Sequence, residues 1–422
     1  MSDFYQRHKL WVWGAIWVLT RALIVAQIGF LNHRSVTSLE DVFLYETWAE
    51  TLAHDHSLPV GELWQYPPGA ALLLPLAELG MHIKGFGPAF AGLMLGFDFL
   101  AFCLIAVLAR RQRRDTGVWI WLLGIPMLRA VPLLRFDMVG TSLAIAALFV
   151  IHRRPAWFGA LAGLGAAIKV WPVILLFGEW KSGRLLRAAA AAAAAIVLVF
   201  AVVALAFSGN VFEFLTEQGG RGLHVEAVGS LPWHLREIVT GEGPRTLSRS
   251  GASEIASGPA DLIAGLLKVA TLAVLVAAAV WWRARRRAID DGRRELADAT
   301  VSRDFVFTLA LLLVVASQVL SPQYLIWLLG LAAVALTNRS SVVARPAWIV
   351  VAAAIVSTAA YGHKGAWGHP PVYGSSFNLV IRNVALLVAA VDASALMWKL
   401  PRRPRPPGLS GANESESAAP NG

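Results

Sequence analysis

The chain has 422 residues, of which 57% are hydrophobic and 15% are charged, and its formal net charge at pH 7 is +10. A water-soluble protein carries about 25% charged residues, so this composition excludes an ordinary soluble domain, intrinsic disorder and a collagen-like chain. The single cysteine, Cys103, lies within an apolar run, so neither an internal disulfide nor a thiolate metal cluster can form.

Apolar runs of about twenty residues recur along the chain, and a helix of that length crosses about 30 Å of hydrocarbon. The first run, 11–31, has no small-residue cleavage motif, which favours a retained span over a signal peptide. Another predicted span is 86–109. The remaining full spans are predicted near 117–133, 138–151, 185–207, 260–282, 304–321, 323–337, 346–361 and 377–398. The chain is therefore predicted to be an all-α, polytopic membrane protein with about ten crossings.

Two other apolar segments are predicted to cross only in part. Segment 67–83 opens with two prolines and has a third at Pro75, which favours a short or re-entrant helix that lies against protein. Segment 156–180 has basic residues at both ends, and its length suits two half-length helices that meet near Lys169 and Pro172. The alternative for 156–180 is one long tilted span.

The positive charge is concentrated in short loops. Of the 37 Lys and Arg residues, 24 lie in seven segments: 1–10, 110–116, 152–155, 181–187, 283–303, 338–345 and 399–405. Cytoplasmic loops are enriched in Lys and Arg, so these segments and both termini are predicted to be cytoplasmic. This distribution explains the net charge without nucleic-acid binding, and we predict a multi-pass protein of the cell membrane.

The polar segments that remain are predicted to face outward, to the periplasmic side. They comprise a first outer loop, 32–66, the corner near Arg135, a large outer loop, 208–257, and the stretch 361–376. Residues 1–399 are predicted to form a single membrane domain. The tail 400–422 has too few apolar groups to offset the entropy of ordering, and we predict a disordered cytoplasmic tail.

Ionisable residues inside spans are candidates for function, because burying them in a bilayer is costly. Four such residues lie one to three turns from a span end: Arg21, Asp98, Lys268 and Arg382. The long side chains of Arg and Lys can reach the interface, whereas Asp98 is expected to pair with another helix. We interpret these four residues as mainly structural.

The first outer loop contains the strongest candidate site. Apolar residues recur there at helical spacing, which predicts an amphipathic surface helix over 39–53: Leu39, Phe43, Leu44, Trp48 and Leu52. Asp41 and Tyr45 are four residues apart and are predicted to share the other face. A carboxylate beside a phenol can remove a proton from a hydroxyl. The alternative is a solvated face on which Glu40, Glu46 and Glu50 are equivalent to Asp41.

A set of short motifs resembles the polyprenol-phosphate-mannose-dependent mannosyltransferases, which are integral-membrane enzymes of the GT-C class. The motifs follow in the order Asp41-x-x-x-Tyr45-x-x-Trp48-Ala49, Trp64-Gln65-Tyr66-Pro67-Pro68, Arg135-Phe136-Asp137, Gly163 to Pro172, Arg221 to Glu226, and Ser321-Pro322-Gln323-Tyr324. The resemblance covers about residues 10–400 and implies a GT-C-like bundle of 10–13 transmembrane helices. The composition, rich in Ala, Arg and Trp, is similar to that of actinobacterial proteins.

The resemblance also implies a mechanism. A polyprenyl-phosphate-mannose donor would give its sugar to a glycolipid or lipoglycan hydroxyl on the outer face, with inversion. Asp41 would be the general base. The leaving phosphate would be bound by Arg135, Lys169, Arg221 and His224. Substrate positioning would fall to Tyr45, Tyr66, Asp137, Gln323 and Tyr324.

Each of these assignments has an alternative. Arg135 can instead pair with Asp137, and Lys169 can reach lipid headgroups. Related enzymes carry histidines after the late Ser-Pro, whereas this chain has Gln323 and Tyr324. The ten histidines are scattered, so we predict no metal site and no cofactor.

Two other classes of function compete with transfer. Broken helices with charges at membrane depth are equally typical of transporters, so a transporter or lipid-linked sugar flippase is the main alternative. The polar surface helix and the large outer loop favour a catalyst. A structural envelope subunit would not need Asp41, Lys169, Arg221 and Gln323 on one side.

Overall fold

The computed structural model describes residues 3–32, 40–61, 64–215, 221–249, 252–359 and 372–401. The helices that are long and apolar enough to span a membrane are α1 (Asp3–Asn32), α4 (Phe86–Gln112), α8 (Ser182–Ala206), α11 (Gly258–Asp290), α12 (Ala299–Ala316) and α15 (Val372–Lys399). Shorter apolar helices of the bundle are α5 (Thr116–Met127), α6 (Asp137–Val150), α7 (Pro155–Ile168), α13 (Tyr324–Ala335) and α14 (Ala344–Ala359). The all-α, polytopic membrane fold is confirmed. Parts of the predicted segments lie outside the described residues: 33–39 and 62–63 of the first outer loop, 216–220 and 250–251 of the large outer loop, the outer stretch up to residue 371, and the tail from residue 402.

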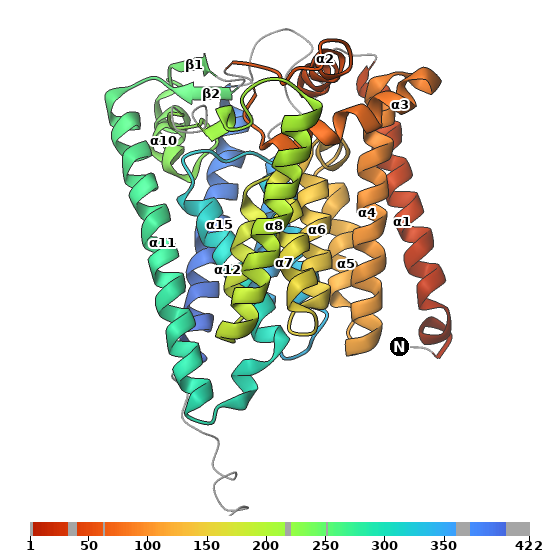
Figure 1. Cartoon of the computed structure of the whole chain (residues 1–422). Helices are drawn as coiled ribbons and strands as arrows, with labels where there is room; N and C mark the ends of the chain where they lie inside the picture. The colour runs from red at the N-terminus through yellow and green to blue at the C-terminus, as the bar shows by residue number, and fades with distance from the viewer. Residues whose placement is uncertain are drawn as a thin grey trace, which may run out of the picture.

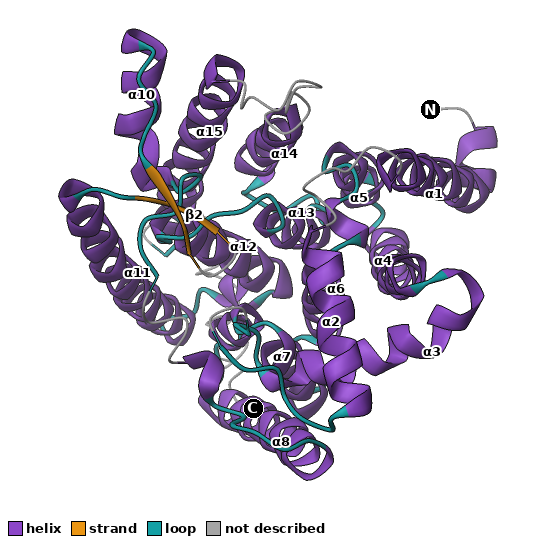
Figure 2. Ribbon diagram, turned by 90° about the horizontal axis from the view of Figure 1, so that it is seen from above, coloured by secondary structure: helices purple, strands orange, loops and turns teal. Residues whose placement is uncertain are grey.

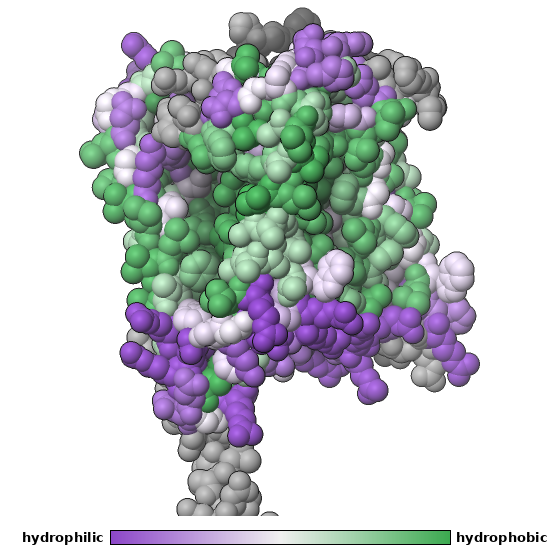
Figure 3. All heavy atoms as spheres, viewed as in Figure 1, coloured by the Kyte–Doolittle hydropathy of each residue, from purple (hydrophilic) through white to green (hydrophobic). Residues whose placement is uncertain are grey.

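The two ends of the bundle differ. Four small elements gather at one end, which we call the α2 end: α2 (Glu40–His54), α3 (Leu74–Lys84), α10 (Leu231–Thr240) and the antiparallel hairpin β1 (Thr246–Arg249) with β2 (Ala252–Ile255) (Figure 1). The N-terminus and the last turn of α15 lie at the other end, the basic end (Figure 1). A hydrophobic belt separates two hydrophilic rims (Figure 3), as expected for a protein that spans a bilayer.

Several of the predicted full spans are shorter than expected. α5 and α13 have 12 residues each and α6 has 14, which correspond to about 18–21 Å at 1.5 Å per residue and fall short of about 30 Å of hydrocarbon. Seen from above, α13 and α6 lie among the other helices (Figure 2), and nearly all residues of α13 are buried. Their non-helical ends therefore contact protein instead of lipid, which permits short helices.

The buried charges of α1 and α4 pair with each other, as predicted for Asp98. Arg21 donates two hydrogen bonds of 2.8 Å to the Asp98 carboxylate. Arg21 also donates to the carbonyl oxygen of Leu122, at 3.2 Å. Pro126 of α5 has no N–H to bond to that carbonyl, so Arg21 supplies the missing donor.

The segment 156–180 has the predicted break. α7 ends at Ile168, Lys169 is extended, and a 3₁₀ segment, η4 (Trp171–Gly178), follows. Pro172 cannot donate to the carbonyl of Ile168, so the helix cannot continue through it. The charged side chain at the break is thus placed by the backbone chemistry of the next few residues.

α7 and α8 pack with unusually close backbones. A Cβ atom placed at Gly159 would lie 1.9 Å from the carbonyl oxygen of Ala188, and one at Gly163 would lie 2.4 Å from that of Ala192. Small residues four apart on both helices allow this approach, as in other membrane helix pairs. The end of α7, with Lys169, is therefore held in a fixed position.

Segment 67–83 does not cross, as predicted. It forms the 3₁₀ segment η2 (Pro68–Leu72) followed by α3, which lies at the α2 end (Figures 1 and 2). A Cβ at Gly69 would lie 2.4 Å from the carbonyl oxygen of Ala167, so η2 sits against the last turn of α7. This contact brings the chain at Tyr66 close to Lys169. Three further 3₁₀ segments are η3 (Val131–Leu133), η5 (Val228–Ser230) and η6 (Arg294–Ala297).

Candidate active site

The surface helix α2 supplies the first site residues, but its faces differ from the prediction. Tyr45 is buried, together with Val42 and Ala49, whereas Phe43 is exposed. Asp41 and Tyr45 therefore do not share a solvent-facing side. The ring of Tyr45 packs inward against Phe136, with ring centroids 4.6 Å apart. The predicted residue Leu39 lies outside the described residues.

Asp41 forms an ion pair with Arg135, which lies in the corner between η3 and α6. The alternative pair of Arg135 with Asp137 does not form. Burial lowers the pKa of Arg135, but Asp41, the phenols of Tyr45 and Tyr66 and the Asp137 carboxylate more than offset it and raise this pKa above its ordinary value. The guanidinium therefore remains charged beside the carboxylate.

Two phenols lie next to this ion pair. The hydroxyls of Tyr45 and Tyr66 share a hydrogen bond of 2.7 Å. Burial, and then the neighbouring phenol of Tyr66, raise the pKa of Tyr45 well above its ordinary value. Tyr45 is therefore a neutral hydrogen-bonding group, and Asp41 is the better proton acceptor of the two.

Lys169 binds Asp137 instead of extending to lipid headgroups. Its ammonium nitrogen lies 3.4 Å from the Asp137 carboxylate and 4.3 Å from the centroid of the Tyr66 ring. The fully buried Asp137 also accepts a hydrogen bond of 2.8 Å from the indole nitrogen of Trp327. Asp137 is thus a counter-ion that positions Lys169 between the first outer loop and α13.

A stack of three aromatic rings borders Lys169. Tyr324 stacks on Trp327 at 4.1 Å, and Trp327 stacks on Trp171 at 5.2 Å. Tyr324 was predicted as a site residue, whereas Trp171 and Trp327 were missed. Trp171 lies in the quoted hairpin motif, so it could have been noticed, but Trp327 gave no signal because it is one of 17 tryptophans in an apolar chain.

The segment 221–227 of the large outer loop lies beside Tyr324. The guanidinium of Arg221 is within electrostatic range of both Tyr324 and His224. The backbone N–H of His224 donates to the carbonyl of Gln318 at 2.9 Å, so this segment is fixed to the turn that precedes α13. Among the described contacts, none joins Gln323 to the residues above.

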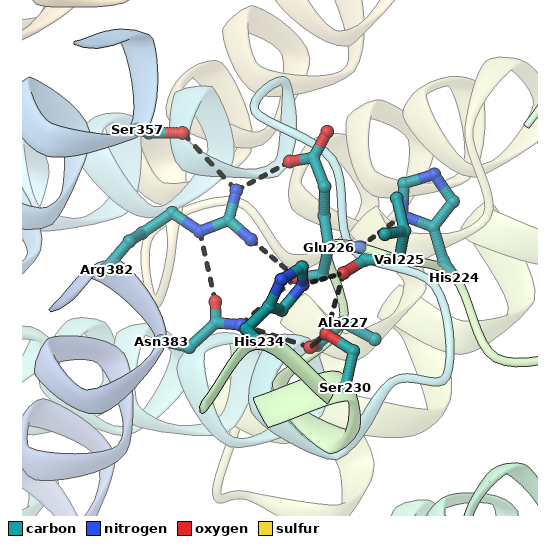
Figure 4. Close-up of polar contacts among 9 residues, drawn as sticks. All are labelled: His224, Val225, Glu226, Ala227, Ser230, His234, Ser357, Arg382 and Asn383. Atoms are coloured by element: carbon teal, nitrogen blue, oxygen red, sulfur yellow. Dashed lines mark hydrogen bonds and ion pairs between the residues drawn. The ribbon is translucent and has the colours of Figure 1, made fainter. Parts of the chain in front are cut away.

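His224 is held as a neutral ring. Its Nδ1 accepts a hydrogen bond of 3.2 Å from the backbone N–H of Glu226 (Figure 4), which requires that Nδ1 carry no proton. Burial is the main cause that lowers the pKa of His224, and the charges of Arg221 and Arg382 lower it further. His224 therefore carries no permanent positive charge, and the backbone around Leu320 engages its ring as well.

Arg382 of α15 holds the next part of the loop. Its guanidinium donates to the Glu226 carboxylate at 2.7 Å and to the Glu226 carbonyl, and Asn383 donates to the carbonyl of Ala227 at 3.1 Å (Figure 4). All of these groups are buried. The Arg382 side chain thus pairs inside the protein instead of reaching the membrane interface, and it fixes the segment after His224 to α15.

The predicted residues thus fall into three groups. One cluster contains Asp41, Tyr45, Tyr66, Arg135, Asp137, Lys169 and Tyr324. Arg221 and His224 adjoin it, and Gln323 stands apart. In the described part of the chain, no group of three or more His, Cys, Asp or Glu side chains is placed to hold a metal ion.

The sequence model of glycosyltransferase family 87 matches residues 64–302, which is more than half of the chain. The chain belongs to glycosyltransferase family 87. The match contains Tyr66, Arg135, Lys169 and His224, whereas Asp41 lies before its first residue. No curated protein and no solved structure matches the chain significantly. A membrane glycosyltransferase is therefore established, and transport is not favoured.

Proposed function

We propose that this family 87 member transfers mannose from a polyprenyl-phosphate-mannose donor to a hydroxyl of a glycolipid or lipoglycan, with inversion. The observation that carries the proposal is the cluster at the α2 end. There the Asp41 carboxylate lies near three kinds of group that can bind phosphate: a guanidinium, an ammonium and phenol hydroxyls. The ion pair of Asp41 with Arg135 and the pair of Lys169 with Asp137 meet around the linked phenols.

In this proposal Asp41 is the general base. The acceptor oxygen forms a bond to the anomeric carbon while the bond from that carbon to the phosphate oxygen breaks. The acceptor proton passes to Asp41, and polyprenyl phosphate leaves with one additional negative charge. Arg135 and Lys169 compensate that charge. Cationic hydrogen-bonding groups stabilise a transition state most when they lie, shielded from water, where the negative charge develops.

The ion pair gives Arg135 a second role in the same scheme. In the free protein the guanidinium is occupied by Asp41. A donor phosphate offers Arg135 a competing anion with suitable geometry, because guanidinium groups bind phosphate oxygens through two parallel hydrogen bonds. Donor binding would then release the Asp41 carboxylate to accept the proton of the acceptor, which orders the two binding events.

The proposed orientation places the α2 end on the outer, periplasmic side of the cell membrane and both termini in the cytoplasm. The concentration of Lys and Arg in the loops of the basic end supports it. Cysteines at the exposed positions Glu50 and Glu242, in a chain without Cys103, should react with an impermeant reagent on intact spheroplasts. A cysteine at Asp290 should react only after permeabilisation, and the reverse pattern would contradict this orientation.

The transfer reaction is tested with purified protein, labelled polyprenyl-phosphate-mannose and an extract of membrane glycolipids. We expect polyprenyl phosphate and a labelled glycolipid to appear together, and neither to appear when the acceptor is left out. Movement of intact donor across a vesicle membrane without release of polyprenyl phosphate would instead support the transporter alternative. Transfer from a donor with a different sugar, and not from mannose, would refute the sugar assignment alone.

A further inference from the structure

α10 of the large outer loop buries two polar side chains and exposes two apolar ones. His234 and Glu237 are only 2% and 6% exposed, whereas Leu235 and Val239 are 50% and 83% exposed. Helices on the surface of a water-soluble region have the opposite arrangement, with the apolar stripe against the core. An outward apolar stripe is stable where the surrounding medium is itself apolar.

Buried hydrogen bonds prevent α10 from turning its apolar side inward. His234 Nδ1 lies 2.8 Å from the hydroxyl of Ser376 in α15, and that hydroxyl donates to the Glu237 carboxylate. The other ring nitrogen of His234 bonds the carbonyl of Val225 at 2.6 Å (Figure 4). Rotating the helix would leave these buried polar groups without partners, which is costly for each group.

The position of α10 along the bundle identifies the medium. It contacts Ser376 in the second turn of α15, within the apolar stretch Ser376–Lys399 that is long enough to span a membrane. Phe377 and Ile381, in the first turns of that span, are exposed apolar residues. α10 therefore lies at the level where the lipid-facing surface of α15 begins, near the upper end of α11 (Figures 1 and 2).

We propose that α10 is an interfacial helix that lies in the membrane leaflet at the α2 end, with Leu235 and Val239 among lipid acyl chains. Arg236 and Thr240 border the apolar stripe and face the headgroups, which is the pattern of helices that lie in a membrane surface. The partner is the lipid bilayer itself. Through His234 and Val225, this anchor ties the segment that carries His224 to the membrane surface.

The test uses nitroxide spin labels on the full-length protein in vesicles of phosphatidylcholine and phosphatidylglycerol. Single cysteines replace Val239 or Glu242 in a Cys103→Ala background, and Leu266→Cys on α11 provides a lipid-facing reference. Relaxation by oxygen, which concentrates in lipid, is compared with relaxation by a water-soluble nickel chelate. We expect the ratio of oxygen to nickel accessibility at 239 to be several-fold higher than at 242 and similar to that at 266.

Two results would overturn the proposal. Nickel accessibility at 239 equal to that at 242 would place the helix in water. Protection of 239 from both reagents would show that a second copy or another protein covers the stripe. Both positions are exposed, so the substitutions leave the buried contacts of α10 intact, and the measurement does not depend on any transferase activity.

Discussion

Replacing Asp41 with Asn separates the role of the carboxylate as a base from its role as a partner of Arg135. General-base catalysis contributes about 10²–10⁴ in rate. At about 1.36 kcal/mol per tenfold change, this corresponds to about 3–5 kcal/mol of activation free energy. The ion pair itself is worth less: Arg135 is only 15% exposed, but the Asp41 side chain is 38% exposed, so solvent screens the pair towards the value of about 0–1 kcal/mol for exposed pairs. Asp41→Asn should therefore fold normally and lose at least about a hundredfold in transfer.

The matched controls are on the same helix. Glu46→Gln and Glu50→Gln remove one negative charge each from α2, and neither residue contacts the cluster among the described contacts. Both variants should keep most of the activity. Arg135→Lys removes the guanidinium but keeps a cation, so it should weaken donor use, with a raised KM, because an ammonium cannot form the same pair of bonds to phosphate.

The assay follows polyprenyl phosphate release under saturating donor and acceptor, with thermal unfolding in detergent as the check on folding. A loss that is similar for Asp41→Asn, Glu46→Gln and Glu50→Gln would mean that overall negative charge matters and not one base. Transfer by folded Asp41→Asn within about tenfold of the wild type would refute the base assignment, since that is the range of a lost ion pair alone.

Three further substitutions test the site and the bundle. Lys169→Ala should destabilise the protein because it leaves the buried Asp137 carboxylate without a counter-ion; adding Asp137→Asn should restore the melting temperature but not the transfer activity. Gly163→Val should lower the melting temperature, because its Cβ would overlap the backbone of α8, at about 1–3 kcal/mol or more, while Gly96→Val, where nothing lies within 4 Å, should not. His224 is held neutral with a lowered pKa, so below about pH 6.5 the unfolded chain binds more protons than the folded protein. The folded protein should therefore become less stable as the pH is lowered. The fall in melting temperature between about pH 7.5 and about pH 5.5 should be smaller in His224→Gln, and an unchanged slope would contradict the assignment.

Some site features follow from the sequence because they depend on neighbouring residues. The break at Lys169 is an example, since Pro172 removes one helical hydrogen bond wherever the segment lies in the fold. The surface helix is another, because its period is visible over 39–53. The face of this helix that packs on the protein could not be assigned from the sequence, because residues at helical spacing include Phe43 on one face and Tyr45 on another. Only the packing of Tyr45 against Phe136 shows which face is buried.

The pairing of charges could not be predicted for a different reason. The motif of Arg135 offers one nearby carboxylate, Asp137, whereas Asp41 lies far away in the sequence. The choice depends on where α7 ends, because a Cβ at Gly140 of α6 would lie 3.5 Å from the Cβ of Lys169, so Lys169 is next to Asp137 one turn earlier. That proximity results from helix packing between distant segments, and no local pattern records it.

The pair of Arg21 with Asp98 constrains how the protein is made. Domains and helices emerge from the ribosome in order from the N-terminus, and a lone arginine raises the free energy of inserting a span by up to about 2.5–3.5 kcal/mol at its centre. The counter-ion of Arg21 is in α4, and the carbonyl of Leu122 that it also binds is in α5. The groups that compensate Arg21 are therefore synthesised after α1, so α1 acquires its full set of buried partners only once α5 is in place.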